Sequence, residues 1–103
     1  MNGNSYAEQG DIIRISGVKH PVLVVSKNFF NKSGEIIGCP IIEGIREEAL
    51  HIMIRTDKCE GLVHCEKLAL LDLRMRHCTK IDSVSINEII DITDAIQGIF
   101  DYI

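Results

Sequence analysis

Two titratable side chains of different type, His64 and Glu66, stand two positions apart in a stretch with the composition of a β-strand. Alternation along a strand would place both on one face, with Cα atoms about 7 Å apart, close enough to flank one phosphate. Histidine changes charge near neutral pH, so such a pair can give and take protons. A solvated polar face is the ordinary alternative, and the spacing alone leaves both readings open.

Basic residues gather in one short segment. Arg74, Arg76, His77 and Lys80 lie close together, whereas the chain from Asp82 onward carries only acidic charges. The formal net charge is −4, which argues against a general nucleic-acid binder, because such binding depends on neutralising phosphates with Lys and Arg. Any contact with a nucleic acid is therefore expected to be local.

The 4 cysteines show no CxxC pair and no other spacing that zinc sites use. Cys39 and Cys65 stand inside apolar, strand-like runs, where a reduced cysteine usually behaves as a small buried hydrophobic residue. We therefore expect core thiols, no metal site and no cofactor.

The length of 103 residues fits one domain. No apolar run approaches the roughly 20 residues of a membrane helix, and the beginning of the chain is polar, so we expect a cytoplasmic protein. Residues 1–9 are rich in Asn, Ser and Gly and are expected to form a flexible tail before a single domain over residues 10–103.

Hydrophobic patterning predicts a mainly β domain. The expected strands are residues 10–16, 20–26, 36–42, 50–56 and 81–84, with residues 61–71 forming one long strand or two short ones, and residues 28–34 a helical turn. Strict alternation at residues 50–56 sets His51, Met53 and Arg55 on one face, opposite the apolar residues.

The last segment changes to a helical period. Ser85 and Glu88 form a capping box, which predicts a helix over residues 86–102. The apolar residues recur at helical spacing and are expected to be buried together: Ile89, Ile92, Ile96, Ile99 and Phe100. The polar residues Asp91, Asp94, Gln97 and Asp101 should point outward. Short strands capped by one helix indicate an α+β fold, a small barrel with a C-terminal amphipathic helix.

The order of these motifs resembles the MazF/PemK family of bacterial toxins over residues 10–100. The resemblance is carried by GDII at 10–13, HPVLVVSKNFFNKSG at 20–34, CPII at 39–42, DLRMRH at 72–77 and the closing helix. It implies an SH3-like barrel, usually a homodimer, that cleaves single-stranded RNA without metal as part of a toxin-antitoxin system. It also implies a small antitoxin protein as partner. We expect the dimer contacts to include Phe29, Phe30, Leu70 and Leu71.

Metal-independent RNA cleavage needs a base for the 2′-hydroxyl, an acid for the leaving 5′-oxygen and a group that stabilises the charged phosphorane. In the PemK-like branch an Arg-Cys-Asp run supplies the acid and the base, and His64, Cys65 and Glu66 match it here. The resemblance implies His64 as acid, Glu66 as base, and His20 or Arg74 as phosphate stabiliser. The expected RNA-binding residues are Arg74, Arg76, Lys19 and Lys67. His51 and His77 match no role and are expected at the surface.

Some family positions carry different residues here. His20 stands where the family has Arg, Ile42 where Thr is common, and the loop at residues 17–19 is short. A catalytically inactive binding module, a regulator that engages nucleic acid or a protein partner on the same fold, is therefore the alternative hypothesis. Retention of polar residues at the positions of His64 and Glu66 favours the nuclease.

Overall fold

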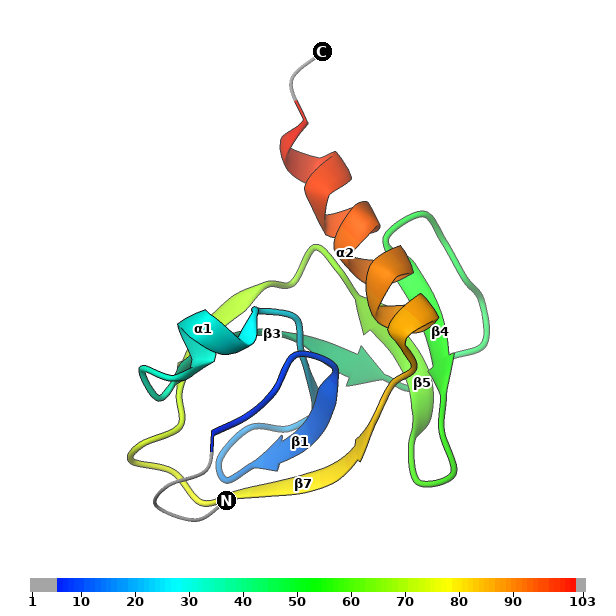
Figure 1. Ribbon diagram of the computed structural model, residues 1–103. Helices are drawn as coiled ribbons and strands as arrows, with labels where there is room; N and C mark the ends of the chain where they lie inside the picture. Colours follow the sequence, from blue (N-terminus) through cyan, green and yellow to red (C-terminus); the bar gives the residue numbers. More distant parts are fainter. Residues whose placement is uncertain (1–5, 102–103) are drawn as a thin grey trace.

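A computed structural model describes residues 6–101, which form a mostly β structure with one long C-terminal helix (Figure 1). The described elements are β1 (Asp11–Ile15), β2 (Val22–Val24), α1 (Asn28–Asn31), β3 (Glu35–Ile42), β4 (His51–Arg55), β5 (Glu60–His64), β6 (Ala69–Asp72), β7 (Cys78–Ser83) and α2 (Ile86–Phe100). The predicted fold class is confirmed. The last strand begins at Cys78 and not at residue 81, because its whole length pairs with β1.

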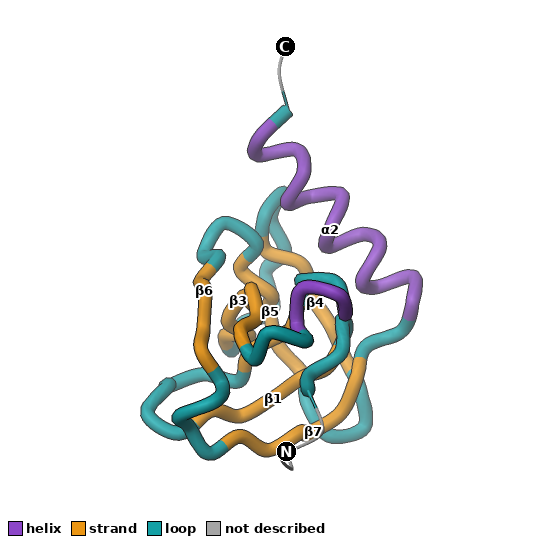
Figure 2. Tube along the Cα trace, turned by 60° about the vertical axis from the view of Figure 1, so that its left-hand side comes forward, coloured by secondary structure: helices purple, strands orange, loops and turns teal. Residues whose placement is uncertain are grey.

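The strands form one 7-stranded antiparallel sheet that curls into a half-barrel, as Figure 2 shows. The order along the sheet is β4-β5-β3-β2-β1-β7, and β6 pairs with β3 outside this path. The strand shared by both parts of the sheet is β3, which spans 8 residues. It pairs with β2 on one edge and with β5 and β6 in succession on the other edge.

The segment predicted as one long strand or two short ones is two strands, β5 and β6. Along β3, Ile41 faces Val63 of β5, and Gly38 faces Ala69 of β6. Between these two registers lies Pro40, which has no amide hydrogen for a ladder bond. The N–H of Ile41 donates to Pro21 on the β2 side, at 2.8 Å, so by alternation the nitrogen of Pro40 faces the other edge.

Opposite Pro40, the segment between β5 and β6 leaves the edge of β3 and forms a turn. The N–H of Lys67 donates to the carbonyl of His64 at 3.0 Å and closes this turn. Glu66 therefore lies in the turn after β5, and the prediction that it shares a strand face with His64 was wrong.

Two apolar clusters hold the sheet in its curled form. The larger lies between the sheet and α2 and contains the buried residues Ile12, Leu23, Val25, Cys39, Ile41, Ile54, Val63, Cys65, Ile89 and Ile92. The smaller lies on the other side of β1 and β2 and contains Ala7, Ile13, Ile15, Val22, Val24, Ile36 and Cys78. Cys39 and Cys65 are fully buried, which confirms the prediction that they are core thiols.

The helix α2 begins at the predicted capping box, where the Ser85 hydroxyl accepts a hydrogen bond from the N–H of Glu88 at 3.2 Å. Its first half packs on the sheet through Ile89 and Ile92. In its second half, Ala95 and Ile96 are partly buried against the larger cluster, and the end of the helix projects beyond the sheet (Figure 1), so that Ile99 is 40% exposed and Phe100 is 71% exposed. The prediction that these two residues belong to the buried face was therefore wrong. Among the described residues, no helix has the length and apolar character to cross a membrane.

Residues 1–9 were predicted to form a flexible tail, and residues 1–5 of this segment lie outside the described residues. Of the remainder, Ala7 is fully buried in the smaller cluster. The side-chain amide of Gln9 donates to the carbonyl of Val25 at 2.8 Å, and its backbone N–H donates to Asn28 Oδ1 at 2.8 Å. These contacts tie residues 7–9 to the chain around α1.

Candidate functional site

Two histidines from neighbouring strands form the centre of the candidate site. His51 opens β4 and His64 closes β5, and the antiparallel register places them directly opposite one another. Paired residues point to the same face of a sheet, so the two imidazole rings meet. Their centroids are 3.8 Å apart and their planes differ by 17°, which is a stacked arrangement. The apolar neighbours Val63 and Ile54 point to the opposite face, into the core.

Two carboxylates hold the ring of His51 from both sides. Its Nε2 lies 2.9 Å from Glu66 Oε2, and its Nδ1 lies 3.2 Å from Glu48 Oε2. His64 differs, because its Nδ1 is buried and has no hydrogen-bond partner among the described residues. His51, His64 and Glu66 thus bring two imidazoles and one carboxylate together, with one ligand atom of each lying within 4.8 Å of the others.

The electrostatics of the cluster follow from this packing. Partial burial lowers the pKa of His64, the neighbouring His51 and Lys67 lower it further, and the carboxylate of Glu66 opposes them. The hydrogen bond from His51 lowers the pKa of Glu66. At neutral pH, His64 is therefore mainly neutral and Glu66 is ionised.

A hollow of about 620 Å³ is lined by Glu60, at the other end of β5 from His64, and by none of His51, His64 and Glu66. His20 lies on its wall and is close enough to His64 to disfavour protonation of that ring. The described residues that line it combine four basic groups with two carboxylates and apolar floor residues: Arg14, Lys19, His20, Lys58, Glu43, Glu60, Pro21, Ile41, Ile42 and Cys59. The positions of His20 and Ile42, taken from the family resemblance, thus line one concave surface.

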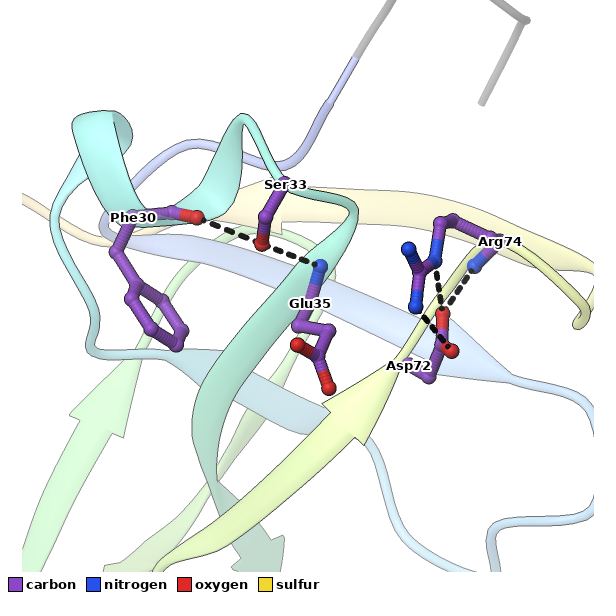
Figure 3. Close-up of polar contacts among 5 residues, drawn as sticks. All are labelled: Phe30, Ser33, Glu35, Asp72 and Arg74. Atoms are coloured by element: carbon purple, nitrogen blue, oxygen red, sulfur yellow. Dashed lines mark hydrogen bonds and ion pairs between the residues drawn. The ribbon is translucent and has the colours of Figure 1, made fainter.

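Arg74 and Arg76 lie at the other end of β3. Asp72 pairs with Glu35 at the beginning of that strand, and the strand's length separates this end from the hollow by roughly 23 Å. Arg74 is held there by Asp72 (Figure 3): Nε donates to Oδ1 at 2.9 Å and Nη2 to Oδ2 at 2.8 Å. This double contact lowers the pKa of Asp72 to about 2. Arg74 therefore does not join His64 and Glu66.

The other predicted site residues are divided between the two ends. Lys19 lines the hollow, and Lys67 is exposed in the turn next to Glu66. Arg76 is exposed on the loop that follows β6. His77 is exposed as predicted, but His51 is half-buried at the centre of the cluster, so its prediction as a surface residue was wrong.

A signal for His51 was present in the sequence. Strands β4 and β5 form a hairpin in which Arg55 faces Glu60 next to the turn. Each step away from the turn moves one residue back along β4 and one residue forward along β5, as far as His51 and His64. A hairpin assigned around residues 56–59 would have placed His51 opposite His64. Alternation within each strand alone does not reveal this pairing between the strands.

A family model described as "PemK-like, MazF-like toxin of type II toxin-antitoxin system" matches residues 8–100 of this chain. A comparison with curated protein sequences gives no match.

Solved structures similar to this chain share its fold at low sequence identity. A MazE-MazF complex from Deinococcus radiodurans contains a chain with 15% identity and a TM-score of 0.84, with 93% of this chain and 97% of that chain covered. An endoribonuclease from Mycobacterial species has 17% identity and a TM-score of 0.80, with 96% and 95% covered. The Mycobacterium tuberculosis toxin MazF-mt6 has 16% identity and a TM-score of 0.70, with 88% and 99% covered.

Proposed function

Because this chain belongs to the PemK-like, MazF-like toxins of type II toxin-antitoxin systems, we propose that it is an endoribonuclease that cleaves single-stranded RNA without a metal ion. One observation carries this proposal: two half-buried histidines and a carboxylate lie together, and His20, which acts electrostatically on His64, lines a hollow with other basic side chains. Such a surface combines groups that transfer protons with cations that attract a phosphodiester. The similarity to a chain named an endoribonuclease supports it.

The RNA backbone enters the hollow, where Lys19 and His20 face its phosphate. His20, which stands where the resembled family has an arginine, provides a hydrogen-bond donor to the charged phosphorane. Lys67, next to Glu66 in the turn, contacts the adjoining part of the backbone. Arg76 and Arg74, at the far end of β3, bind a more distant phosphate.

The proton transfers are divided between His64 and the pair formed by His51 and Glu66. His64, which is mainly neutral, accepts the proton of the 2′-hydroxyl. When both ring nitrogens of His51 are protonated, Nδ1–H donates to Glu48 and Nε2–H to Glu66, and this imidazolium passes the Nε2 proton to the leaving 5′-oxygen. This assignment makes His64 the base and gives the acidic side to Glu66 and its partner, the reverse of the roles implied by the resemblance alone.

The protein acts as a homodimer and is neutralised by a small antitoxin protein. Phe29 is 75% exposed and Leu70 is 60% exposed, and both belong to the set of residues predicted for the dimer contact. Apolar side chains of this size at the surface favour burial against a second copy. The similarity to MazF chains in MazE-MazF complexes supports the antitoxin partner. Light scattering at low micromolar concentration should give about twice the chain mass of 11.5 kDa, and a monomer would refute the dimer.

The decisive experiment is cleavage of a mixed-sequence single-stranded RNA in the presence of a chelator. His64→Ala and Glu66→Gln should each reduce the rate by roughly 100-fold or more. The exposed His77→Ala is the matched control and should leave the rate unchanged. The products should end in a 2′,3′-cyclic phosphate, as expected when the 2′-hydroxyl is the nucleophile.

Two results would refute the nuclease. Equal cleavage by wild type and His64→Ala would place the active site elsewhere. RNA binding without cleavage by the wild-type protein would identify the chain as a binding module on this fold.

A further inference from the structure

We propose that His51, His64 and Glu66 bind Zn²⁺ and that the bound ion inhibits proton transfer by these side chains. The metal-binding half of this proposal depends only on the geometry of the cluster. The inhibitory half rests on the proposed function, because it assumes that His64 and Glu66 act on RNA.

The three side chains already lie close to the geometry of a metal site. One ligand atom of each lies within 4.8 Å of the others, whereas ligands at Zn–N and Zn–O distances of about 2.0–2.2 Å lie roughly 3.4 Å apart. Closure therefore requires movements of only about 1.5 Å. Glu66 can supply part of this movement, because its side chain is 38% exposed and lies in a turn. One of the two stacked rings must also rotate, since the nitrogen lone pairs of parallel rings do not converge.

A second, independent observation is the buried Nδ1 of His64, which lacks a hydrogen-bond partner among the described residues. Buried polar atoms in folded proteins almost always have a partner, and a bound ion is one of the partners that can satisfy them. The ring that carries this nitrogen is stacked on the ring of His51, a second ligand of the proposed site. Rotation of the His64 ring toward the ion would give it a partner.

Glu48 supplies the outer support that histidine ligands of metals usually have. Its Oε2 lies 3.2 Å from His51 Nδ1. A carboxylate at this position accepts the Nδ1–H, so that the Nε2 lone pair is directed toward the metal. The ion takes the place of the proton between His51 Nε2 and Glu66 Oε2, and that proton leaves to solvent.

The donor set selects the class of ion. Two imidazole nitrogens and one carboxylate oxygen suit Zn²⁺ and the neighbouring ions Co²⁺ and Ni²⁺. Mg²⁺ and Ca²⁺ prefer oxygen ligands alone and should not compete. The nearby thiols of Cys39 and Cys65 face the core and stay protonated, because burial raises their pKa to about 12 and about 11.

Binding is tested with Co²⁺ added to the full-length wild-type protein, followed by displacement with Zn²⁺. We expect visible d–d absorption without the near-ultraviolet charge-transfer band of a thiolate ligand. His51→Gln and Glu66→Gln should each weaken Co²⁺ binding by more than the roughly 10–100-fold that loss of an outer-shell partner costs, and Glu48→Gln by about 10-fold. His77→Gln, which changes an exposed histidine outside the cluster, is the matched control and should bind normally. Circular dichroism shows that each variant is folded.

Several results would overturn the site: no Co²⁺ binding by the wild type, normal binding by folded His51→Gln and Glu66→Gln, or equal loss in His77→Gln. The inhibitory half is tested by titrating Zn²⁺ into the RNA cleavage assay. Cleavage should fall and return on addition of a chelator, and Glu48→Gln should need about 10-fold more Zn²⁺. Cleavage that Zn²⁺ does not affect refutes inhibition. A protein that binds Co²⁺ as expected but does not cleave RNA refutes the proposed function and leaves the metal site standing.

Discussion

Ile92→Ala should lower the free energy of unfolding strongly, because this residue lies in the part of α2 that packs on the sheet. Ile92 is fully buried and belongs to the larger cluster, which also contains Ile12 and Leu23. Substitution of a buried isoleucine by alanine removes its transfer free energy and leaves a cavity, at a cost of about 2–5 kcal/mol. A domain of this size is stable by only about 5–15 kcal/mol, so the loss is a large fraction of the total.

Phe100→Ala is the matched control, because the side chain removed is larger but is 71% exposed. Substitutions at exposed positions usually change the free energy of unfolding by no more than about 0.5 kcal/mol. A loss of 3 kcal/mol corresponds to a fall in Tm of roughly 12–24 °C for a domain of about 100 residues, so the two variants differ clearly.

The assay is thermal unfolding followed by circular dichroism, repeated at two protein concentrations. The second concentration detects any contribution from association. A fall of less than about 4 °C for Ile92→Ala would mean that α2 does not contribute to the core. Equal, large falls for both variants would mean that the projecting half of α2 is buried against another chain.

Three further predictions follow from other contacts. In an NMR titration Asp72 should titrate near pH 2, because Arg74 lowers its pKa to about 2, and in Arg74→Ala the pKa should move toward 3.8. The stabilisation from this pair is present above pH 3.8 and is lost as the pH falls through about 2. A wild-type midpoint near 3.8 would contradict the contact. Iodoacetamide at pH 8 should modify the partly exposed Cys59 and spare Cys39 and Cys65, which are fully buried and whose pKa burial raises to about 12 and about 11. In denaturant all of them should react. Gly38→Ala should destabilise the fold by about 1–3 kcal/mol, because the added Cβ would collide with Val22. Gly98→Ala in α2 should stabilise it by up to about 1 kcal/mol, because the added Cβ meets nothing within 4 Å. Effects of the same sign in both variants would refute this packing.

Local patterns in the sequence were sufficient to predict most of the fold. The capping box of Ser85 and Glu88 fixes where α2 begins, and both partners of that box are within one helical turn. The end of the buried face was not predictable in this way, because the exposure of Phe100 depends on how far the sheet extends beneath the helix.

The candidate site was predicted only in part, because its geometry depends on pairing between strands. Neighbours in the sequence pointed to His64 and Glu66, which the fold does bring together. The partner that connects them, His51, comes from the other strand of a hairpin. The basic cluster failed as a guide for the same reason, since Arg74 lies beside Asp72 at the far end of β3 and away from the hollow.

The pairing of β1 with β7 constrains the order in which a newly made chain can fold. Asp11 of β1 faces Ser83 of β7, which is far from it in the sequence. The larger cluster also lacks Ile89 and Ile92 until α2 has been synthesised. Since domains are made from the N-terminus and distant contacts form slowly, neither the last strand pairing nor the complete core is available to a partly synthesised chain. The domain therefore completes its fold only after β7 and α2 have been synthesised, which leaves an interval in which its apolar sheet is open to chaperones.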